Sequence, residues 1–265
     1  MEKCAVIVNT CDQNMDLLDN FFYLFHRFWA NCPYRVYINT EKLQYTKQNI
    51  QTLYCNQTVS WCKRLRKCIK EINSKYVILL LEDFYLESKV DQDEIDRVIA
   101  YMDGDDNIIS FCFDPINMDN TESKYQKYWE RKRRGKYRHC LQAGIWRTDY
   151  LINVLNIEAS PWEFEYTYNF LSFNKNYRFY CIKEKKLSPF AYSSGYLVYR
   201  GKYVKEEIEK FQNMFNLQFS PTRDIISKRE AVEKIGVIQK VIRRIEIYKK
   251  QLRVRLINMH TREGI

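Results

Sequence analysis

Runs of apolar residues alternate along the first 114 residues with segments whose apolar residues recur every three or four positions. The runs are typical of strands, and the recurring spacing is typical of amphipathic helices. We expect strands at 4–10, 35–41, 75–84 and 107–114, and helices at 15–29, 59–72 and 91–103. Strands that alternate with helices predict an α/β fold with a mostly parallel open sheet and helices on both faces. The third strand is apolar without interruption, which favours burial on both faces.

Beyond residue 114 the pattern is less regular. Residues 141–155 predict a short strand and a short helix, and residues 179–203 predict two strands and a turn. Between them, Ser160 is a candidate N-cap for a helix with proline at its first position. In the last segment, residues 229–260, apolar residues recur at helical spacing and basic residues outnumber acids. This segment predicts a basic amphipathic helix or helix pair.

Two adjacent acids, Glu82 and Asp83, end the strongly apolar third strand. A buried carboxylate is costly unless it is paired, hydrogen-bonded or bound to a metal, so we expect the pair where the strand reaches the surface. The first strand also ends in a polar segment, residues 10–12. Because ligands bind outside the carboxyl ends of parallel strands, the two loops are predicted to converge on one cleft.

The charge of the chain indicates an anionic partner. Lysine and arginine number 43 against 33 aspartate and glutamate residues, which gives a formal net charge of +10 and a pI near 9.0. The charge alone does not distinguish between three kinds of partner: nucleic acid, a phosphorylated small molecule and an acidic membrane surface.

The sequence also indicates a reducing compartment. The nine cysteines are odd in number and irregularly spaced, which predicts neither a disulfide framework nor a zinc site. The first residues lack the pattern of a signal peptide, and the longest apolar runs fall far short of the roughly 20 residues of a membrane-spanning helix. We therefore expect a cytoplasmic protein.

Five segments, taken in order, resemble bacterial GT-A-type glycosyltransferases of surface and capsular polysaccharide biosynthesis. They are NTCDQNMDLL, SWCKRL, LLLEDF, LQAGIW and SPWEFE, and the resemblance runs from Cys4 to Lys202. It implies a Rossmann-like, GT-A-like fold that takes a nucleotide-sugar donor and a glycan or lipid-linked acceptor. On this basis we expect a catalytic domain at 1–222, with a nucleotide-sugar half at 1–113 and an acceptor half at 114–222, followed by a helical tail at 223–265.

The resemblance implies that Thr10 and Asp12 contact the base and ribose of the donor. A carboxylate can accept hydrogen bonds from a ribose hydroxyl or a base N–H. Asp12 alternatively starts a turn or caps the next helix. Arg64, Arg200 and Lys202 are candidates to meet the diphosphate through charge-assisted hydrogen bonds. For Arg64 the alternative is a solvated helix face.

GT-A enzymes usually carry a D-x-D motif that holds Mg²⁺ or Mn²⁺, and here Glu82-Asp83-Phe84 takes its place. Hard oxygen ligands suit such an ion, and the resemblance implies Asp83 as the metal ligand, with Glu82 or Glu87 as further candidates. Adjacent acids on an extended strand point to opposite faces, so both can reach one ion only if a turn lies between them. Metal dependence therefore stays open.

The helix start WEFE resembles the segment that supplies the catalytic base of many inverting GT-A enzymes. Glu163 and Glu165 are the candidates, with Glu163 favoured and helix N-terminal stabilisation as the alternative. Gln142, Trp146 and Trp162 are expected to bind the acceptor, because aromatic faces pack on the apolar side of a sugar ring. For each tryptophan the alternative is core packing.

The basic tail fits a helix on an anionic membrane surface, which would make the protein peripheral at the inner face of the membrane. A tail packed on its own domain or on a partner is the alternative. The basic and aromatic segment at 124–140 motivates a different class, a nucleic-acid-binding protein, although no recognition signature accompanies it. A retaining enzyme and an inactive scaffold on the same fold are further alternatives.

Overall fold

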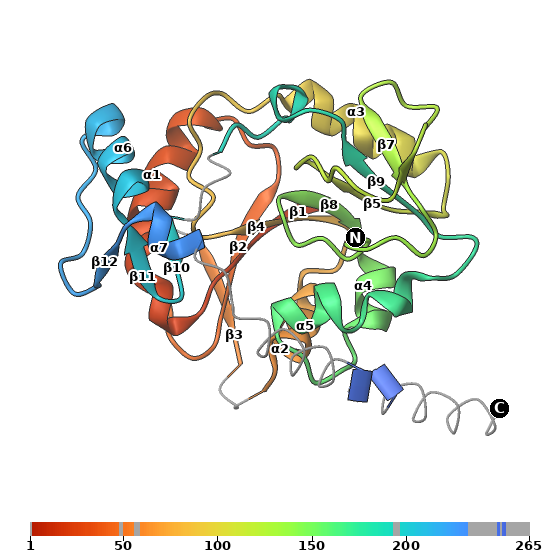
Figure 1. The fold of residues 1–265 in the computed structure, drawn as a ribbon, viewed down its shortest axis with the longest axis horizontal. Coiled ribbons are helices and arrows are strands. Elements are labelled where there is room, and N and C mark those ends of the chain that lie inside the picture. The colour runs from red at the N-terminus through yellow and green to blue at the C-terminus, as the bar shows by residue number, and fades with distance from the viewer. Residues whose placement is uncertain are drawn as a thin grey trace.

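The computed structural model describes residues 2–47, 50–55, 59–192, 197–232, 248–249 and 251–252. Its centre is a nine-stranded mixed sheet with strand order β3-β2-β1-β4-β8-β5-β9-β7-β6 (Figure 1). The strands are β1 (Glu2–Asn9), β2 (Arg35–Thr40), β3 (Gln51–Tyr54), β4 (Ser74–Leu81), β5 (Ile108–Cys112), β6 (Asn120–Thr121), β7 (Tyr128–Arg131), β8 (Gly144–Arg147) and β9 (Arg178–Ile182). Seven of the nine run in one direction, and β7 and β8 run against them. The expected α/β class with a mostly parallel sheet is confirmed.

Helices cover both faces of this sheet. One face carries α1 (Leu18–Phe28) and α3 (Gln92–Asp103), and the other carries α2 (Trp61–Ile72), α4 (Thr148–Val154) and α5 (Pro161–Tyr166) (Figure 1). Residues of β1 alternate between the two apolar cores, with Val6 and Val8 in the first and Ile7 in the second. The uninterrupted apolar strands of the sequence are therefore explained by burial on both sides.

A small three-stranded sheet lies beside α1 (Figure 1). It is formed by β10 (Val198–Tyr199), β11 (Lys202–Val204) and β12 (Ile225–Ile226), with α6 (Lys205–Phe215) between the last two strands and α7 (Lys228–Val232) after them. The tight turn from β10 to β11 has positive φ angles at Arg200 (51°) and Gly201 (81°), as a two-residue hairpin requires. Three 3-10 helices complete the fold: η1 (Asp12–Leu17), η2 (Asn169–Ser172) and η3 (Lys185–Leu187).

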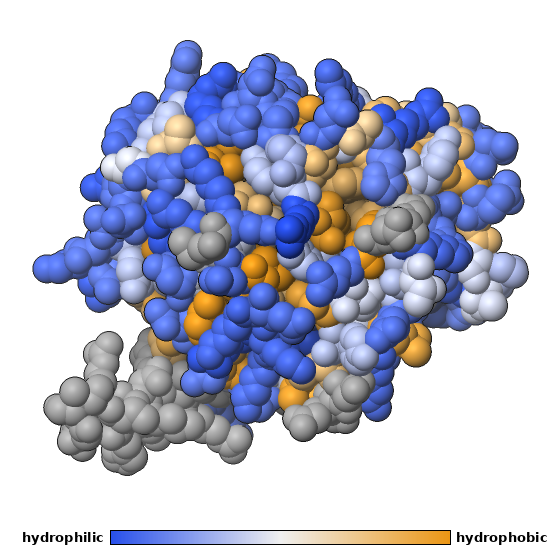
Figure 2. Space-filling view, turned by 180° about the vertical axis from the view of Figure 1, so that it is seen from behind, coloured by the Kyte–Doolittle hydropathy of each residue, from blue (hydrophilic) through white to orange (hydrophobic). Residues whose placement is uncertain are grey.

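The first residues of the predicted tail join the main body, because β12 pairs with β11. Most of the remaining tail lies outside the described residues. At 248–249 and 251–252 the chain is helical, and Tyr248 and Leu252 are exposed. None of the described helices combines the length and the apolar character needed to cross a bilayer. On the face shown in Figure 2, hydrophilic side chains cover most of the surface and hydrophobic ones show mainly in a central band.

The register of the strands places the predicted loops together. In the parallel pair β1–β4, Asn9 lies beside Leu81, so Thr10 and Glu82 leave neighbouring strands at the same edge of the sheet. Strand β8 starts at this edge, since Gly144 pairs with Leu79. Any side chain at Gly144 would place its Cβ 2.8 Å from the carbonyl oxygen of Phe111, which explains the glycine of the LQAGIW segment.

Candidate active site

The two acids lie in a tight turn directly after β4. The turn is closed by a hydrogen bond of 3.1 Å from the Phe84 N–H to the Leu81 carbonyl. The turn that the sequence requires if both acids are to reach one ion is therefore present. Glu82 is buried and accepts a hydrogen bond from the Asn14 side-chain amide, whereas Asp83 is half-buried.

Both carboxyl groups of this acid turn are held in an unfavourable environment. Burial raises the pKa of Glu82 and of Asp83, and the neighbouring charge of Asp83 raises the pKa of Glu82 further. Two acids in this state gain from a cation, because a positive charge favours their ionised forms. The acid turn is thus a candidate cation-binding feature at this edge of the sheet.

The fit to a divalent ion is partial. Among the described residues, no group of three or more His, Cys, Asp and Glu side chains could hold a metal ion. Mg²⁺, however, is commonly bound by one or two protein carboxylates together with substrate phosphates. Asp83 and Glu82 fit that kind of shared site, in which a ligand completes the coordination.

The loop after β1, residues 10–14, is called the first loop here, and Asp12 fixes its conformation. Its Oδ1 accepts hydrogen bonds from three successive backbone N–H groups at 3.1–3.3 Å, those of Glu41, Lys42 and Leu43, and its own N–H donates to the Glu41 side chain. The structure therefore shows the alternative role for Asp12, a turn-forming one. Contact with a ribose through Oδ1 would have to compete with these three amides.

Arg64 lies against the same loop. Its Nη1 donates to the Thr10 carbonyl at 2.9 Å, and its side chain is buried, so a solvated helix face is excluded. Burial lowers the pKa of Arg64, although the charges of Glu41 and Asp12 oppose that effect. Thr10 is itself buried. Thr10, Asp12 and Arg64 form a polar floor beside the acid turn.

The two candidate bases differ in their surroundings. Glu163 completes a capping box, because its Oε2 accepts from the N–H of Ser160 at 2.8 Å and from the Ser160 hydroxyl at 2.9 Å. Glu163 therefore has the alternative role, stabilisation of the N-terminus of α5. Glu165 is half-buried, accepts the Leu141 N–H at 2.7 Å, and has a pKa that burial raises to about 7. A carboxyl with that pKa suits general base chemistry near neutral pH, so the structure favours Glu165 over Glu163.

Contacts connect Glu165 with the acid turn. Leu141, which binds Glu165, precedes Gln142, and the Gln142 Oε1 accepts from the Tyr192 hydroxyl at 3.2 Å. The Tyr192 ring stacks on Phe84 with centroids 4.5 Å apart, next to Asp83. Gln142 therefore lies between the candidate base and the candidate donor site.

The two candidate acceptor-binding tryptophans differ in exposure. Trp162 is 66% exposed at the start of α5 and is accessible to a sugar. Trp146 is only 1% exposed and packs in the core among His139 and Phe179. The predicted acceptor contact of Trp146 is wrong, because the indole presents no accessible face; core packing is its role here.

The basic residues of the hairpin turn lie near the first loop. Arg200 is exposed, and a Cβ added to Gly201 would lie 3.1 Å from the side-chain nitrogen of Gln13. Lys202 pairs with Asp224 at 3.0 Å. The hairpin thus borders the candidate site, with Arg200 accessible and Lys202 engaged at the surface.

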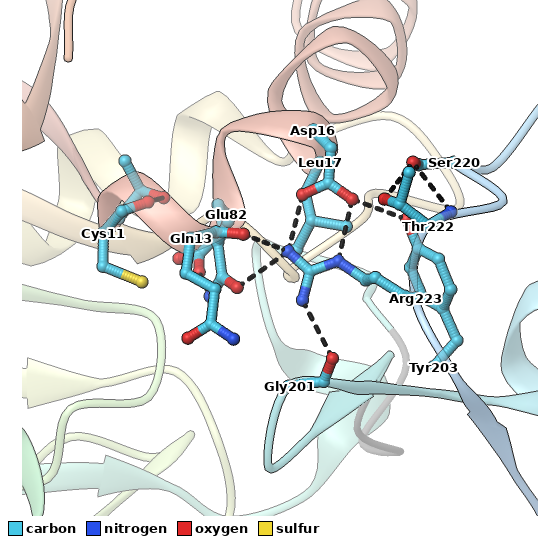
Figure 3. A network of polar contacts seen from close by, with 12 residues as sticks. Cys11, Gln13, Asp16, Leu17, Glu82, Gly201, Tyr203, Ser220, Thr222 and Arg223 are labelled. Carbon is cyan, nitrogen blue, oxygen red and sulfur yellow. Dashed lines mark hydrogen bonds and ion pairs between the residues drawn. The ribbon is translucent and has the colours of Figure 1, made fainter.

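Sequence reasoning missed three groups at this edge. Asn14 binds Glu82. Arg223 binds the first loop at Gln13 (Figure 3). Lys185 binds Asp114 at 2.6 Å and lies over the Tyr192 ring. Asn14 lies in the segment NTCDQNMDLL, so the resemblance could have identified it as a site residue. No sequence pattern pointed to Arg223, because it is 207 residues away from its partner Asp16.

No protein-family model matches the sequence, and no curated protein matches it. Among solved structures the chain is similar to a cytidylyltransferase from Leptospira borgpetersenii serovar Hardjo-bovis, with 12% identity and a TM-score of 0.47 over 93% of this chain and 97% of that one. It is similar to a fragment of S. aureus TarS in complex with UDP, with 14% identity and a TM-score of 0.44 over 72% and 59%. A third similar structure is the bifunctional IspDF from Campylobacter jejuni, with 15% identity and a TM-score of 0.35 over 58% and 43%. The chain spans less than two thirds of the TarS and IspDF chains, and these likenesses assign no reaction to it.

Proposed function

We propose that the protein is a glycosyltransferase that moves a sugar from a nucleotide-activated donor to a glycan or lipid-linked acceptor of surface polysaccharide biosynthesis. The observation that carries the proposal is the register of β1 with β4, which sets the loop after Asn9 beside the acid turn after Leu81. A polar floor, a buried arginine and two destabilised acids at one sheet edge are the features that a nucleoside diphosphate with its cation would use.

The donor site in this proposal has two parts. The loop at residues 10–14 and Arg64 meet the nucleoside and the diphosphate, and the exposed Arg200 approaches the diphosphate from the hairpin. Asp83, with Glu82 behind it, would hold a divalent ion at the acid turn. The ion would neutralise charge on the departing diphosphate; these residues orient it and the donor.

Glu165 is the proposed base. The acceptor hydroxyl oxygen attacks the anomeric carbon while its proton passes to the Glu165 carboxylate. The new carbon–oxygen bond forms as the bond to the diphosphate oxygen breaks, and the nucleoside diphosphate leaves with the electron pair. This direct displacement inverts the anomeric centre. Gln142 and Trp162 hold the acceptor.

A thermal-shift panel tests the proposal. The ligands are UDP-glucose, UDP-N-acetylglucosamine, GDP-mannose and CMP-N-acetylneuraminate, each with and without Mn²⁺, together with UTP and CTP. A ligand present at 100 times its dissociation constant adds about 2.7 kcal/mol to the free energy of unfolding, so a true donor is easily detected. We expect one nucleotide-sugar to stabilise the protein, and more strongly with Mn²⁺.

A matched pair of variants makes the panel specific. Asp83→Asn removes an acid of the turn and should abolish the Mn²⁺-dependent part of the shift. Asp106→Asn changes an exposed acid near the start of β5, at the opposite edge of the sheet, and should leave the shift unchanged. No stabilisation by any nucleotide-sugar would contradict the proposal, and stabilisation by UTP or CTP alone would indicate nucleotidyl transfer instead.

A further inference from the structure

Arg223 joins the C-terminal segment to the first loop of the sheet. It follows a turn in which the Thr222 N–H donates to the Ser220 hydroxyl at 3.4 Å, and it extends from the small sheet toward η1 (Figure 3). The Arg223 side chain is only 7% exposed, although it lies at a sheet edge rich in polar groups. A long charged side chain this well buried requires partners.

The guanidinium group uses its donors on the protein itself. Nε and Nη2 bind the two oxygens of Asp16 at 2.8 Å and 2.5 Å, and Nη1 donates to the Gly201 carbonyl at 3.2 Å. Nη2 also lies 2.5 Å from the Gln13 carbonyl oxygen and 2.9 Å from Asn14 Oδ1. These contacts join Arg223 to residues 13–16 and to Gly201, so its side chain holds η1 in place.

Asp16 is held ionised for this contact. Burial opposes the charge, but hydrogen bonds from Arg223 and from the Tyr203 hydroxyl, the latter at 2.9 Å, lower the pKa of Asp16. The pair is bidentate, the geometry that a guanidinium group forms and a lysine cannot. Arg223 therefore has a fixed position relative to η1.

The contact with Asn14 has a directional consequence. An asparagine side chain has one accepting and two donating sites. Because Arg223 donates to Asn14 Oδ1, the Asn14 nitrogen is turned toward Glu82 Oε1, to which it donates. The opposite orientation would place N–H against N–H at Arg223, which has donors only. Arg223 thus selects the orientation that steadies the acid turn.

We propose that Arg223 is a positioning residue for the donor site, which acts through Asn14 on Glu82 and makes the segment 220–226 part of that site. The inference rests on the proposed function and extends it to residues 223–226, which the sequence assigns to the tail. The competing explanation is a strut that stabilises the fold without any effect on ligand binding.

Three arginine variants separate these explanations. Arg223→Gln removes the bidentate pair, and Arg223→Lys keeps the charge but cannot hold Asp16 and Asn14 together. Arg147→Gln is the matched control, because Arg147 is also buried and donates to the Met102 and Ile108 carbonyls, but at the opposite edge of the sheet. Each variant is titrated by calorimetry, at a temperature at which it is folded, with the nucleotide-sugar that stabilises the wild type most.

We expect Arg223→Gln and Arg223→Lys each to raise the dissociation constant and the KM of the nucleotide-sugar at least tenfold. The kcat should change less than about threefold, because residue 223 does not touch the reacting atoms. Arg147→Gln should lower stability but leave the dissociation constant within about twofold. Adding Asn14→Ala to Arg223→Gln should weaken binding little further, because the two residues act in series. Wild-type affinity in Arg223→Gln, or rescue by lysine, would overturn the inference.

A second measurement keeps the inference separate from the proposed function. If the wild type binds no member of the panel, the proposed function fails. NMR then tests the positioning role, because it follows the exchange of the Asn14 side-chain amide protons with solvent. Protection in the wild type that is lost in Arg223→Gln supports it. Equal protection in both proteins overturns it.

Discussion

Replacement of Glu165 by glutamine should lower turnover and raise stability at once. Glutamine keeps an oxygen for the Leu141 N–H, which Glu165 now accepts at 2.7 Å, but it cannot take a proton from an acceptor hydroxyl. General base catalysis contributes about 10²- to 10⁴-fold to a rate, so a loss of that size is expected in kcat. In the wild type, kcat should fall as the pH drops below about 7, the pKa to which burial raises Glu165.

The effect on stability follows from the same pKa. A carboxyl whose pKa is raised on folding, here from 4.5 to about 7, favours the folded state fully below pH 4.5 and loses that contribution as the pH rises through 7. Each pKa unit corresponds to about 1.4 kcal/mol, so ionised Glu165 costs the folded protein up to about 3 kcal/mol above pH 7. Glu165→Gln removes this cost.

Denaturant unfolding at pH 5 and pH 8 measures the difference. The variant should be more stable than the wild type by about 2–3 kcal/mol at pH 8 and by much less at pH 5. Glu122→Gln, at an exposed glutamate, is the control for the chemical change itself. An equal stability difference at both pH values would refute the electrostatic reasoning, and an unchanged kcat would remove Glu165 from the reaction.

Three further predictions concern residues whose roles the structure separates. Glu163→Ala breaks the capping box with Ser160 and should lower the free energy of unfolding by about 1 kcal/mol, as denaturation can measure. Initial-rate assays should find kcat within about threefold of the wild-type value. A large loss of kcat at wild-type stability would instead indicate that Glu163 is the base. Trp146→Ala should destabilise the protein by about 3–5 kcal/mol, whereas Trp162→Ala should leave the midpoint of unfolding unchanged and raise the KM of the acceptor; the reverse pattern would contradict their placement. Gly201→Ala strains a residue with φ of 81° and should lower stability by about 1 kcal/mol, and an unchanged midpoint would argue against the hairpin turn.

The first half of the fold was predictable because its signals are local. The helix at 91–103 was expected from the spacing of its apolar residues, and α3 begins there, with the Asp91 side chain accepting the Glu94 N–H at 3.1 Å. The apolar runs gave the strands, and the parallel rule brought the loops at residues 10–12 and 82–83 to one edge. These inferences needed only periodicity, capping residues and the usual direction of β-α-β connections.

The candidate site was predicted less well, because contacts between distant segments decide it. Asp12 has the residue type of a ribose ligand, yet the loop after β2 supplies three amides that occupy one of its oxygens. Glu163 and Glu165 look alike in the sequence and differ in their partners, since the Glu163 side chain bends back to Ser160 and the Glu165 side chain approaches Leu141. No local pattern encodes either outcome.

Hydrogen–deuterium exchange with and without the stabilising nucleotide-sugar tests the two-loop site most directly. If the loops after β1 and β4 hold one ligand, peptides that cover residues 10–17 and residues 81–87 should both gain protection on binding. Peptides from the opposite edge, such as those around residues 103–107, should not change. Protection that appears in neither loop, or elsewhere on the molecule alone, would contradict the site.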